Sequence, residues 1–171
     1  MFTLENYIVA GEKLALTIAM MVAFVAVTLM VPARYFNLRL PDLNELGTTS
    51  VVIVAFLCIG LLVRTGGHIS IEVTSLLKSQ RMRFIFRQIA NVGILLFVGT
   101  FGVQALKLLE SAISSGEATL GMNIPLVFPF GALVVGLILA AFHTLMNCAR
   151  DLKVLRSPGA EFEMEEAVIP E

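Results

Sequence analysis

Four long runs of residues without formal charge are the feature that most constrains how this chain folds. They cover residues 14–33, 46–63, 88–106 and 120–149. About 20 residues of α-helix cross a hydrocarbon core of roughly 30 Å, and a helix inside lipid satisfies its own backbone hydrogen bonds. The runs therefore predict an all-α membrane protein with four transmembrane helices, at about 14–33, 46–63, 88–106 and 122–149.

The composition agrees with a membrane protein and excludes other classes. Hydrophobic residues make up 57% of the chain and charged residues 15%, whereas a soluble domain has about 25% charged residues. A net charge of −1 offers no basic surface for nucleic acid, so we expect membrane lipid and no nucleic acid as a partner. The 2 cysteines are too few for a disulfide framework or a cysteine zinc site. We expect no enzymatic activity and no catalytic, cofactor-binding or metal-binding residues.

The first run predicts a retained helix rather than a cleaved signal sequence. Its apolar stretch is longer than a typical signal-peptide core, and Glu5 and Glu12 interrupt the basic segment that would precede one. The first span is then expected to begin at residue 14, which leaves Glu12 outside it.

The distribution of Lys and Arg predicts the orientation of the chain. With four spans, both termini and the middle loop share one side of the membrane. Of the 12 Lys and Arg residues, only Arg34, Arg39 and Lys107 fall on the opposite side. This asymmetry predicts that both termini are cytoplasmic.

Two segments outside the spans have distinct patterns. Residues 68–80 repeat apolar side chains at helical spacing from Ile69 to Leu77, which predicts a short amphipathic helix in the cytoplasmic interface between the second and third spans. The same segment would also alternate as a strand through Ile71 and Val73.

The chain divides into two parts at the end of the fourth helix. Residues 157–171 begin with a helix-breaking Ser-Pro-Gly sequence and continue with many glutamates and few groups that could pack. This predicts a four-helix membrane domain over 1–156 and an acidic, disordered cytoplasmic tail over 157–171.

The spans are free of formal charge, which indicates a class of function. An ionisable side chain in mid-membrane costs about 2.5–3.5 kcal/mol on insertion scales and is kept mainly for transport, proton relay or ligand binding. No Asp, Glu, Lys or Arg lies in the four runs, and Glu110 follows the end of the third. The pattern predicts a chain that does not bind and move a charged solute by itself.

His143 is the one ionisable group within a run. We interpret it as a polar group that hydrogen-bonds to a neighbouring helix. The alternative is haem ligation, which needs a second ligand at similar depth. The other histidine, His68, lies in the loop after the second span.

The loop between the first two spans carries two cations and two anions, Arg34, Arg39, Asp42 and Glu45. It is either a solvated loop, in which Asp42 and Glu45 complement the dipole of the second helix, or a functional surface. As a functional surface it would dock an outside partner, or Arg34 and Glu45 would form an ion pair that fixes the hairpin.

The second span ends at Arg64, which is typical of a residue whose charge reaches the interface. Gly66 and Gly67 permit a sharp reversal of the chain, and His68 would cap the next helix or contact lipid headgroups. The candidate structural or partner-interface residues are Arg34, Asp42, Glu45, Arg64, Gly66, Gly67 and His68.

Together these segments resemble the small membrane (Q) subunits of tripartite ATP-independent periplasmic (TRAP) transporters. The resemblance covers roughly residues 10–150. The residues that carry it are Arg34-Tyr35, Pro41, Glu45, Gly60, the run from Arg64 to Ile69, Leu120-Gly121, Pro125 and Pro129 to Gly131.

This resemblance implies a small permease subunit of the bacterial inner membrane. Such a subunit scaffolds a large sodium-coupled elevator permease (M) subunit and helps to dock a periplasmic substrate-binding (P) protein. The transporter would take up an organic anion, a carboxylate or sugar acid, by sodium symport, and the subunit would need no cofactor. Two alternatives are the small subunit of another tripartite carboxylate carrier and a small b-type cytochrome that uses His68 and His143.

Overall fold

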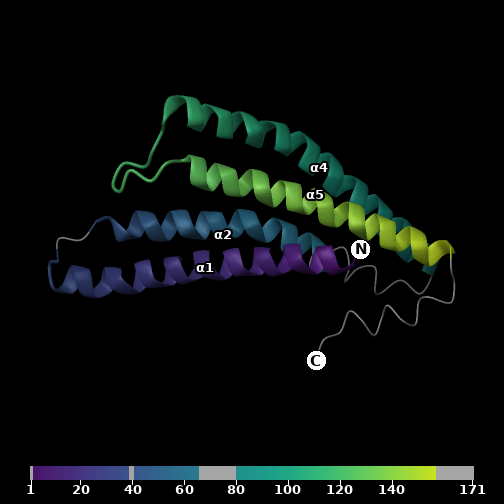
Figure 1. Cartoon of the computed structure of the whole chain (residues 1–171), viewed down its shortest axis with the longest axis horizontal. Helices are drawn as coiled ribbons and strands as arrows, with labels where there is room; N and C mark the ends of the chain where they lie inside the picture. The colour runs from purple at the N-terminus through teal and green to yellow at the C-terminus, as the bar shows by residue number, and fades with distance from the viewer. Residues whose placement is uncertain (1, 39–40, 66–79, 157–171) are drawn as a thin grey trace.

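The chain folds into long α-helices. The structure is a computed structural model that describes residues 2–38, 41–65 and 80–156, and in this part of the chain it has four helices (Figure 1). They are α1 (Phe2–Tyr35), α2 (Leu43–Thr65), α4 (Gln80–Ser115) and α5 (Val127–Arg156). Each contains a segment long and apolar enough to cross a membrane, which confirms the predicted all-helical class. The interfacial helix predicted at 68–80, apart from Gln80, and the predicted tail at 157–171 lie outside the described residues.

The helices differ from the predicted spans at their ends. α1 and α4 extend well beyond 14–33 and 88–106, because charged residues that end an apolar run do not end a helix. α5 begins at Val127, later than residue 122, because the preceding residues form a folded-back loop. In that loop the amide of Thr119 donates to the carbonyl of Ile124 over 3.0 Å.

The four helices lie side by side in the order α1, α2, α5, α4 (Figure 1). The main contacts are between α1 and α2, α2 and α5, and α4 and α5. The loops from α1 to α2 and from α4 to α5 lie at one end of this row, which we call the hairpin end. The start of α1, the end of α2, the start of α4 and the end of α5 lie at the other, which we call the terminal end.

Glycines set the close approach of α2 and α5. A Cβ atom at Gly136 of α5 would overlap the carbonyl oxygen of Phe56 in α2, and one at Gly60 of α2 would lie 2.7 Å from the Cβ atom of Leu139. The two backbones therefore meet where these side chains are absent. A Cβ atom would meet nothing within 4 Å at Gly93, Gly99, Gly102 or Gly131.

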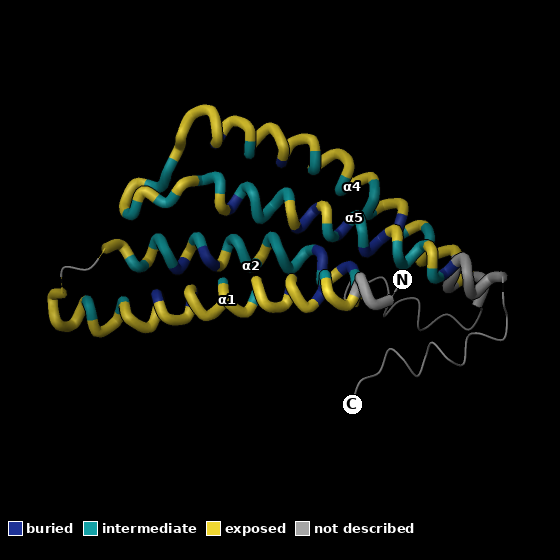
Figure 2. Tube along the Cα trace, in the orientation of Figure 1, coloured by how far each residue is buried: buried dark blue, intermediate teal, exposed yellow. Residues whose placement is uncertain are grey.

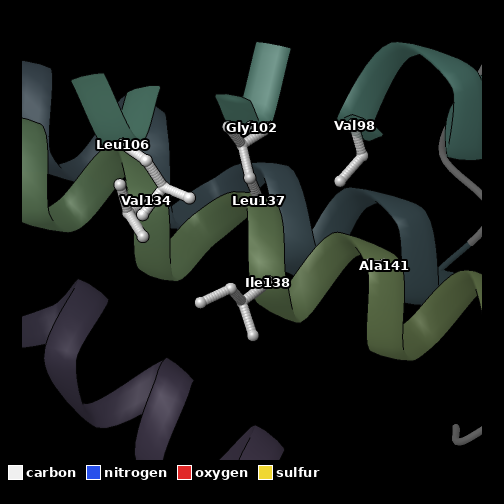
Figure 3. A pocket seen from close by; sticks show the side chains of 7 residues that line it. All are labelled: Val98, Gly102, Leu106, Val134, Leu137, Ile138 and Ala141. Atoms are coloured by element: carbon white, nitrogen blue, oxygen red, sulfur yellow. The ribbon is translucent and has the colours of Figure 1, made fainter. Parts of the chain in front are cut away.

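The outer helices of the row expose most of their apolar surface (Figure 2). Only 17% of the span in α1 and 11% of that in α4 is buried, against 39% in α5. Between α4 and α5 there is an apolar groove of about 190 Å³ (Figure 3). It is lined by Val98, Gly102, Leu106, Val134, Leu137, Ile138 and Ala141. In a membrane these surfaces are available to lipid or to another subunit.

Candidate functional site

At the hairpin end, Glu45 joins the two loops. It lies in the first turn of α2, and its carboxylate accepts hydrogen bonds from the backbone amides of Gly121 (3.2 Å) and Met122 in the loop between α4 and α5. Gly121 permits this contact, since a Cβ atom there would lie 2.7 Å from Oε2 of Glu45. A single carboxylate thus fastens the start of α2 to the loop that joins α4 to α5.

Asp42 caps the helix that carries Glu45. It directly precedes α2, and its Oδ1 accepts from the backbone amide of Glu45 over 3.4 Å. This is the side-chain contact of an N-cap residue. A glutamate three positions after the cap usually reaches back to the cap residue, whereas here Glu45 reaches across to the other loop.

Arg34 lies apart from Glu45. It is exposed in the last turn of α1, and the left-handed Asn37 (φ 49°) follows shortly after the helix. The amide of Leu38 donates to the carbonyl of Ala33 over 2.9 Å and that of Asn37 to Arg34, the pattern of a Schellman cap. The ion pair between Arg34 and Glu45 is not among the contacts of the described residues, and the backbone caps determine how α1 ends.

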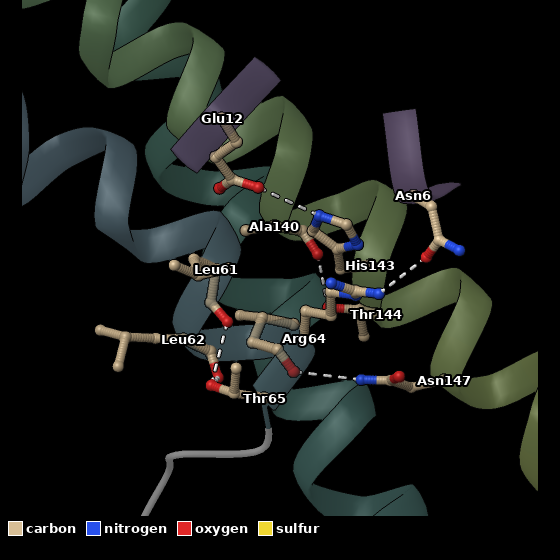
Figure 4. Close-up of polar contacts among 11 residues, drawn as sticks. Asn6, Glu12, Leu61, Leu62, Arg64, Thr65, Ala140, His143, Thr144 and Asn147 are labelled. Carbon is tan, nitrogen blue, oxygen red and sulfur yellow. Dashed lines mark hydrogen bonds and ion pairs between the residues drawn. The ribbon is translucent and has the colours of Figure 1, made fainter. Parts of the chain in front are cut away.

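At the terminal end, the end of α2 is bonded to both neighbouring helices (Figure 4). Nη2 of Arg64 donates to Oδ1 of Asn6 in α1 over 3.3 Å. The side-chain amide of Asn147 in α5 donates to the carbonyl of Val63 over 3.1 Å. Arg64 therefore contributes to helix packing, while Gly66, Gly67 and His68 lie outside the described residues.

Glu12, which precedes the predicted span at 14–33, belongs to α1 and is buried among the helices. Only 5% of the surface of Glu12 is exposed. Its Oε2 lies 3.4 Å from Nε2 of His143, and the exposed fractions of the two side chains are 1% and 0% (Figure 4). The predicted hydrogen bond of His143 is not found within the described residues, where neither ring nitrogen has a hydrogen-bond partner; the imidazole instead lies at ion-pair distance from a carboxylate.

Glu12 was missed because a count of uncharged residues stops at the first charge. The helical spacing of the apolar residues in α1 could have indicated that Glu12 is buried. Over residues 6–35 of α1, the buried residues are Val9, Glu12, Ala23 and Ala26. Their spacing of three and eleven places them on one helical face. A carboxylate in register with buried alanines indicates a partner on a neighbouring helix.

A second buried acid, which the sequence did not indicate, joins α4 to α5. Asp151 is 8% exposed, and its Oδ1 lies 3.0 Å from Nη2 of Arg87. Its Oδ2 accepts from Nε2 of Gln88, also over 3.0 Å. Both partners lie near the start of α4, so the three side chains fasten the two helices at the terminal end.

The arrangement offers contacts between helices rather than reactive chemistry. Among the residues in 2–38, 41–65 and 80–156, no group of three or more His, Cys, Asp or Glu side chains could hold a metal ion. The haem alternative required His143 as an axial ligand, but this side chain is fully buried against Glu12 and has no open face.

One comparison with known proteins gives a match. A family described as "Tripartite ATP-independent periplasmic transporters, DctQ component" matches residues 16–154. The matched range begins in α1, ends in α5 and includes the whole of α2 and α4. Neither a curated protein nor a solved structure matches the chain.

Proposed function

The chain belongs to the DctQ family of small permease (Q) subunits of tripartite ATP-independent periplasmic transporters, and we propose that it braces a large permease subunit that carries the solute. The observation that carries this proposal is the single row of four helices. A carrier encloses its solute between helices that open alternately to each side. In this row, by contrast, the outer helices α1 and α4 expose most of their apolar surface.

The use of polar groups within the row also supports a bracing function. The buried acids Glu12 and Asp151 contact His143 on α5 and Arg87 on α4, respectively. The groove between α4 and α5 is lined by apolar residues and glycine only. Such a surface fits lipid chains or the apolar helices of a partner better than a charged solute.

The solute and the coupling ion would belong to the other components. Within the proposal, a periplasmic protein captures an organic anion such as a carboxylate or sugar acid, and the large subunit moves it together with sodium ions. The protein would lie in the bacterial inner membrane, with both termini in the cytoplasm and the hairpin end facing the periplasm. The excess of Lys and Arg in the segments of the terminal side supports this orientation.

The hairpin end would then add to the surface on which the periplasmic protein docks. It presents exposed apolar and basic side chains: Arg34, Tyr35, Phe36 and Leu120. Replacing Arg34 by Ala should lower uptake by the complete transporter without loss of the complex. Lys13→Ala, at an exposed position near the terminal end, is the matched control.

Co-purification tests the proposed function. The tagged chain is isolated from membranes of its own host in a mild detergent, and the mass and composition of the complex are measured. We expect a larger multispan permease in a fixed ratio to this chain. A monodisperse chain that takes up solute without any other membrane protein would overturn the proposal.

A further inference from the structure

The loop between α4 and α5 carries an apolar side chain that no described residue covers. Leu120, at the turn of this loop, is fully exposed. Such a side chain gains free energy when a partner surface removes it from water. A single exposed leucine is common on protein surfaces, so its importance depends on how the loop presents it and on what surrounds it.

The loop on both sides of Leu120 is held in one shape. On one side, the amide of Thr119 donates to the carbonyl of Ile124 over 3.0 Å, and the hydroxyl of Thr119 accepts from the amide of Ile124 over 2.9 Å. On the other side, the amides of the next two residues donate to the carboxylate of Glu45. The leucine between these bonded residues is presented in a fixed position, which lowers the entropy lost when a partner binds it.

The chain around this leucine is acidic. Residues 41–45 and 116–126 contain no Lys, Arg or His and three carboxylates: Asp42, Glu45 and Glu117. Oδ2 of Asp42 would lie 2.9 Å from a Cβ atom at Gly121, the next residue after the leucine. Both Asp42 and Glu117 are exposed. An apolar side chain therefore projects from a negatively charged surface.

The cations of the first loop belong to its other side. Arg34 lies in the last turn of α1, on the opposite side of α2 from α5 (Figure 1). Arg39 lies outside the described residues. The described charged groups that are nearest to Leu120, by contact with the loop or along the chain, are thus all acidic.

A lipid surface is a poor match for this loop. Anionic lipid headgroups attract polybasic segments, whereas residues 116–126 carry one acidic and no basic side chain. The backbone of the loop is irregular, and unpaired backbone groups are unfavourable in hydrocarbon. The apolar edges offered to a large membrane subunit run along α1 and α4, while the loop lies at the hairpin end of the row (Figure 1). Its position and charge therefore fit a soluble protein that approaches from that end.

We propose that Leu120 is the apolar anchor on which the periplasmic component docks, and that this component offers an apolar pocket rimmed by basic side chains. This rests on the proposed function, because it requires a periplasmic partner at the hairpin end. Glu45 is then a positioning residue, since it holds the two residues that follow the leucine. The acidic side chains around the loop attract the basic rim and speed the encounter.

Binding of the purified periplasmic component to the complete complex in lipid nanodiscs tests the anchor. Leu120→Ala should raise the Kd by about 10- to 100-fold, because the pocket no longer buries a leucine side chain. Leu145→Ala, at a 57% exposed position of α5, is the matched control and should bind as the wild type does. Equal affinity of Leu120→Ala and the wild type would overturn the proposal.

The salt dependence of association tests the basic rim. Asp42→Asn combined with Glu117→Gln should slow association by up to about tenfold at low ionic strength and flatten its salt dependence. Asparagine keeps the helix cap that Asp42 provides. Glu110→Gln, at an exposed position on α4, is the control. Association of the double variant that is as fast and as salt-dependent as that of the wild type would contradict the proposal.

Two further measurements exclude the other occupants. If Leu120 met the large membrane subunit, Leu120→Asp would prevent the two membrane subunits from co-purifying. If it lay in lipid, an environment-sensitive fluorophore on Leu120→Cys, in a chain without its other cysteines, would report apolar surroundings before the periplasmic component is added. Either result would overturn the proposal.

Failure of the anchor is distinguishable from failure of the proposed function. A complex that contains the large permease, and whose Leu120→Ala variant binds the periplasmic component as the wild type does, refutes the anchor and leaves the bracing function intact. Absence of the large permease after co-purification contradicts the bracing function itself.

Discussion

Single glycines decide how closely the two central helices approach. The backbone of α5 at Gly136 lies against the carbonyl group of Phe56 in α2, with no room for a Cβ atom. Gly99 of α4, in contrast, faces open space within 4 Å. The helix packing therefore requires a glycine at position 136 of α5 but not at position 99 of α4.

Gly136→Ala should destabilise the chain by about 1–3 kcal/mol, because overpacking forces the two backbones apart. Gly99→Ala should be neutral or slightly stabilising, by up to about 1 kcal/mol, because alanine favours helix more than glycine does. Thermal unfolding in nanodiscs measures both variants. Equal stability of the two variants would show that α2 and α5 do not meet at Gly136.

Glu45 should control the mobility of the loop between α4 and α5. Glu45→Ala removes the acceptor for the amides of Gly121 and Met122, so hydrogen exchange at these amides should become faster. Glu45→Gln keeps a single acceptor oxygen and should have an intermediate effect. Glu110→Ala is the control, and unchanged exchange in Glu45→Ala would show that the loop holds its shape without the carboxylate.

The residues of the candidate site were only partly predictable from sequence. Asp42 and Glu45 were recognised at the start of a helix because cap residues act locally. The contact of Glu45 with Gly121, and that of Glu12 with His143, join segments far apart in the chain. No local pattern names such a partner.

Each helix in the row is attached to its neighbour by a few polar contacts near the terminal end. Arg64 and Asn6 join α2 to α1, and Asn147 joins α5 to α2. Asp151 joins α5 to α4 through Arg87 and Gln88. α4 is also packed nearer the hairpin end, where Ala105 and Ala112 are each 1% exposed, and the contacts of Asp151 add a polar attachment at the terminal end.

Asp151→Ala should loosen α4 at the terminal end and destabilise the chain by about 1–2 kcal/mol. The loss is smaller than for a fully buried ion pair, because the side chain of Arg87 is 49% exposed. Hydrogen exchange at the start of α4 measures the effect, with Glu110→Ala as control. Exchange as slow as in the wild type would show that apolar packing alone holds α4.

The apolar runs predicted the helices well because lipid demands long apolar segments with internal hydrogen bonds. They did not predict the helix ends, since α1 and α4 continue as helices through charged residues outside the runs. The order α1, α2, α5, α4 was also not predictable. Spans that are apolar on all sides do not indicate which side meets another helix.

The whole molecule has two chemically different ends, and its orientation can be measured. With Cys58 and Cys148 replaced by Ala, a cysteine is placed at Leu120, fully exposed at the hairpin end, or at Tyr7, 78% exposed near the terminal end. A membrane-impermeant maleimide should label Leu120→Cys in intact cells and Tyr7→Cys only after permeabilisation. The reverse pattern would place both termini in the periplasm.

The row of helices has two long apolar edges, along α1 and α4, and both are available for contact with another protein or with lipid (Figure 2). A subunit of this shape can enlarge the membrane-embedded part of a bigger protein without containing a transport pathway of its own. The central claim of the proposed function is that this chain takes up no solute alone and supports uptake only together with its partners.

Reconstitution in liposomes tests that claim most directly. Uptake of a solute that binds the periplasmic component is measured with this chain alone, with the large permease alone, and with both together. We predict sodium-dependent uptake only when both membrane subunits and the periplasmic component are present. Uptake by liposomes that contain this chain as the sole membrane protein would contradict the account.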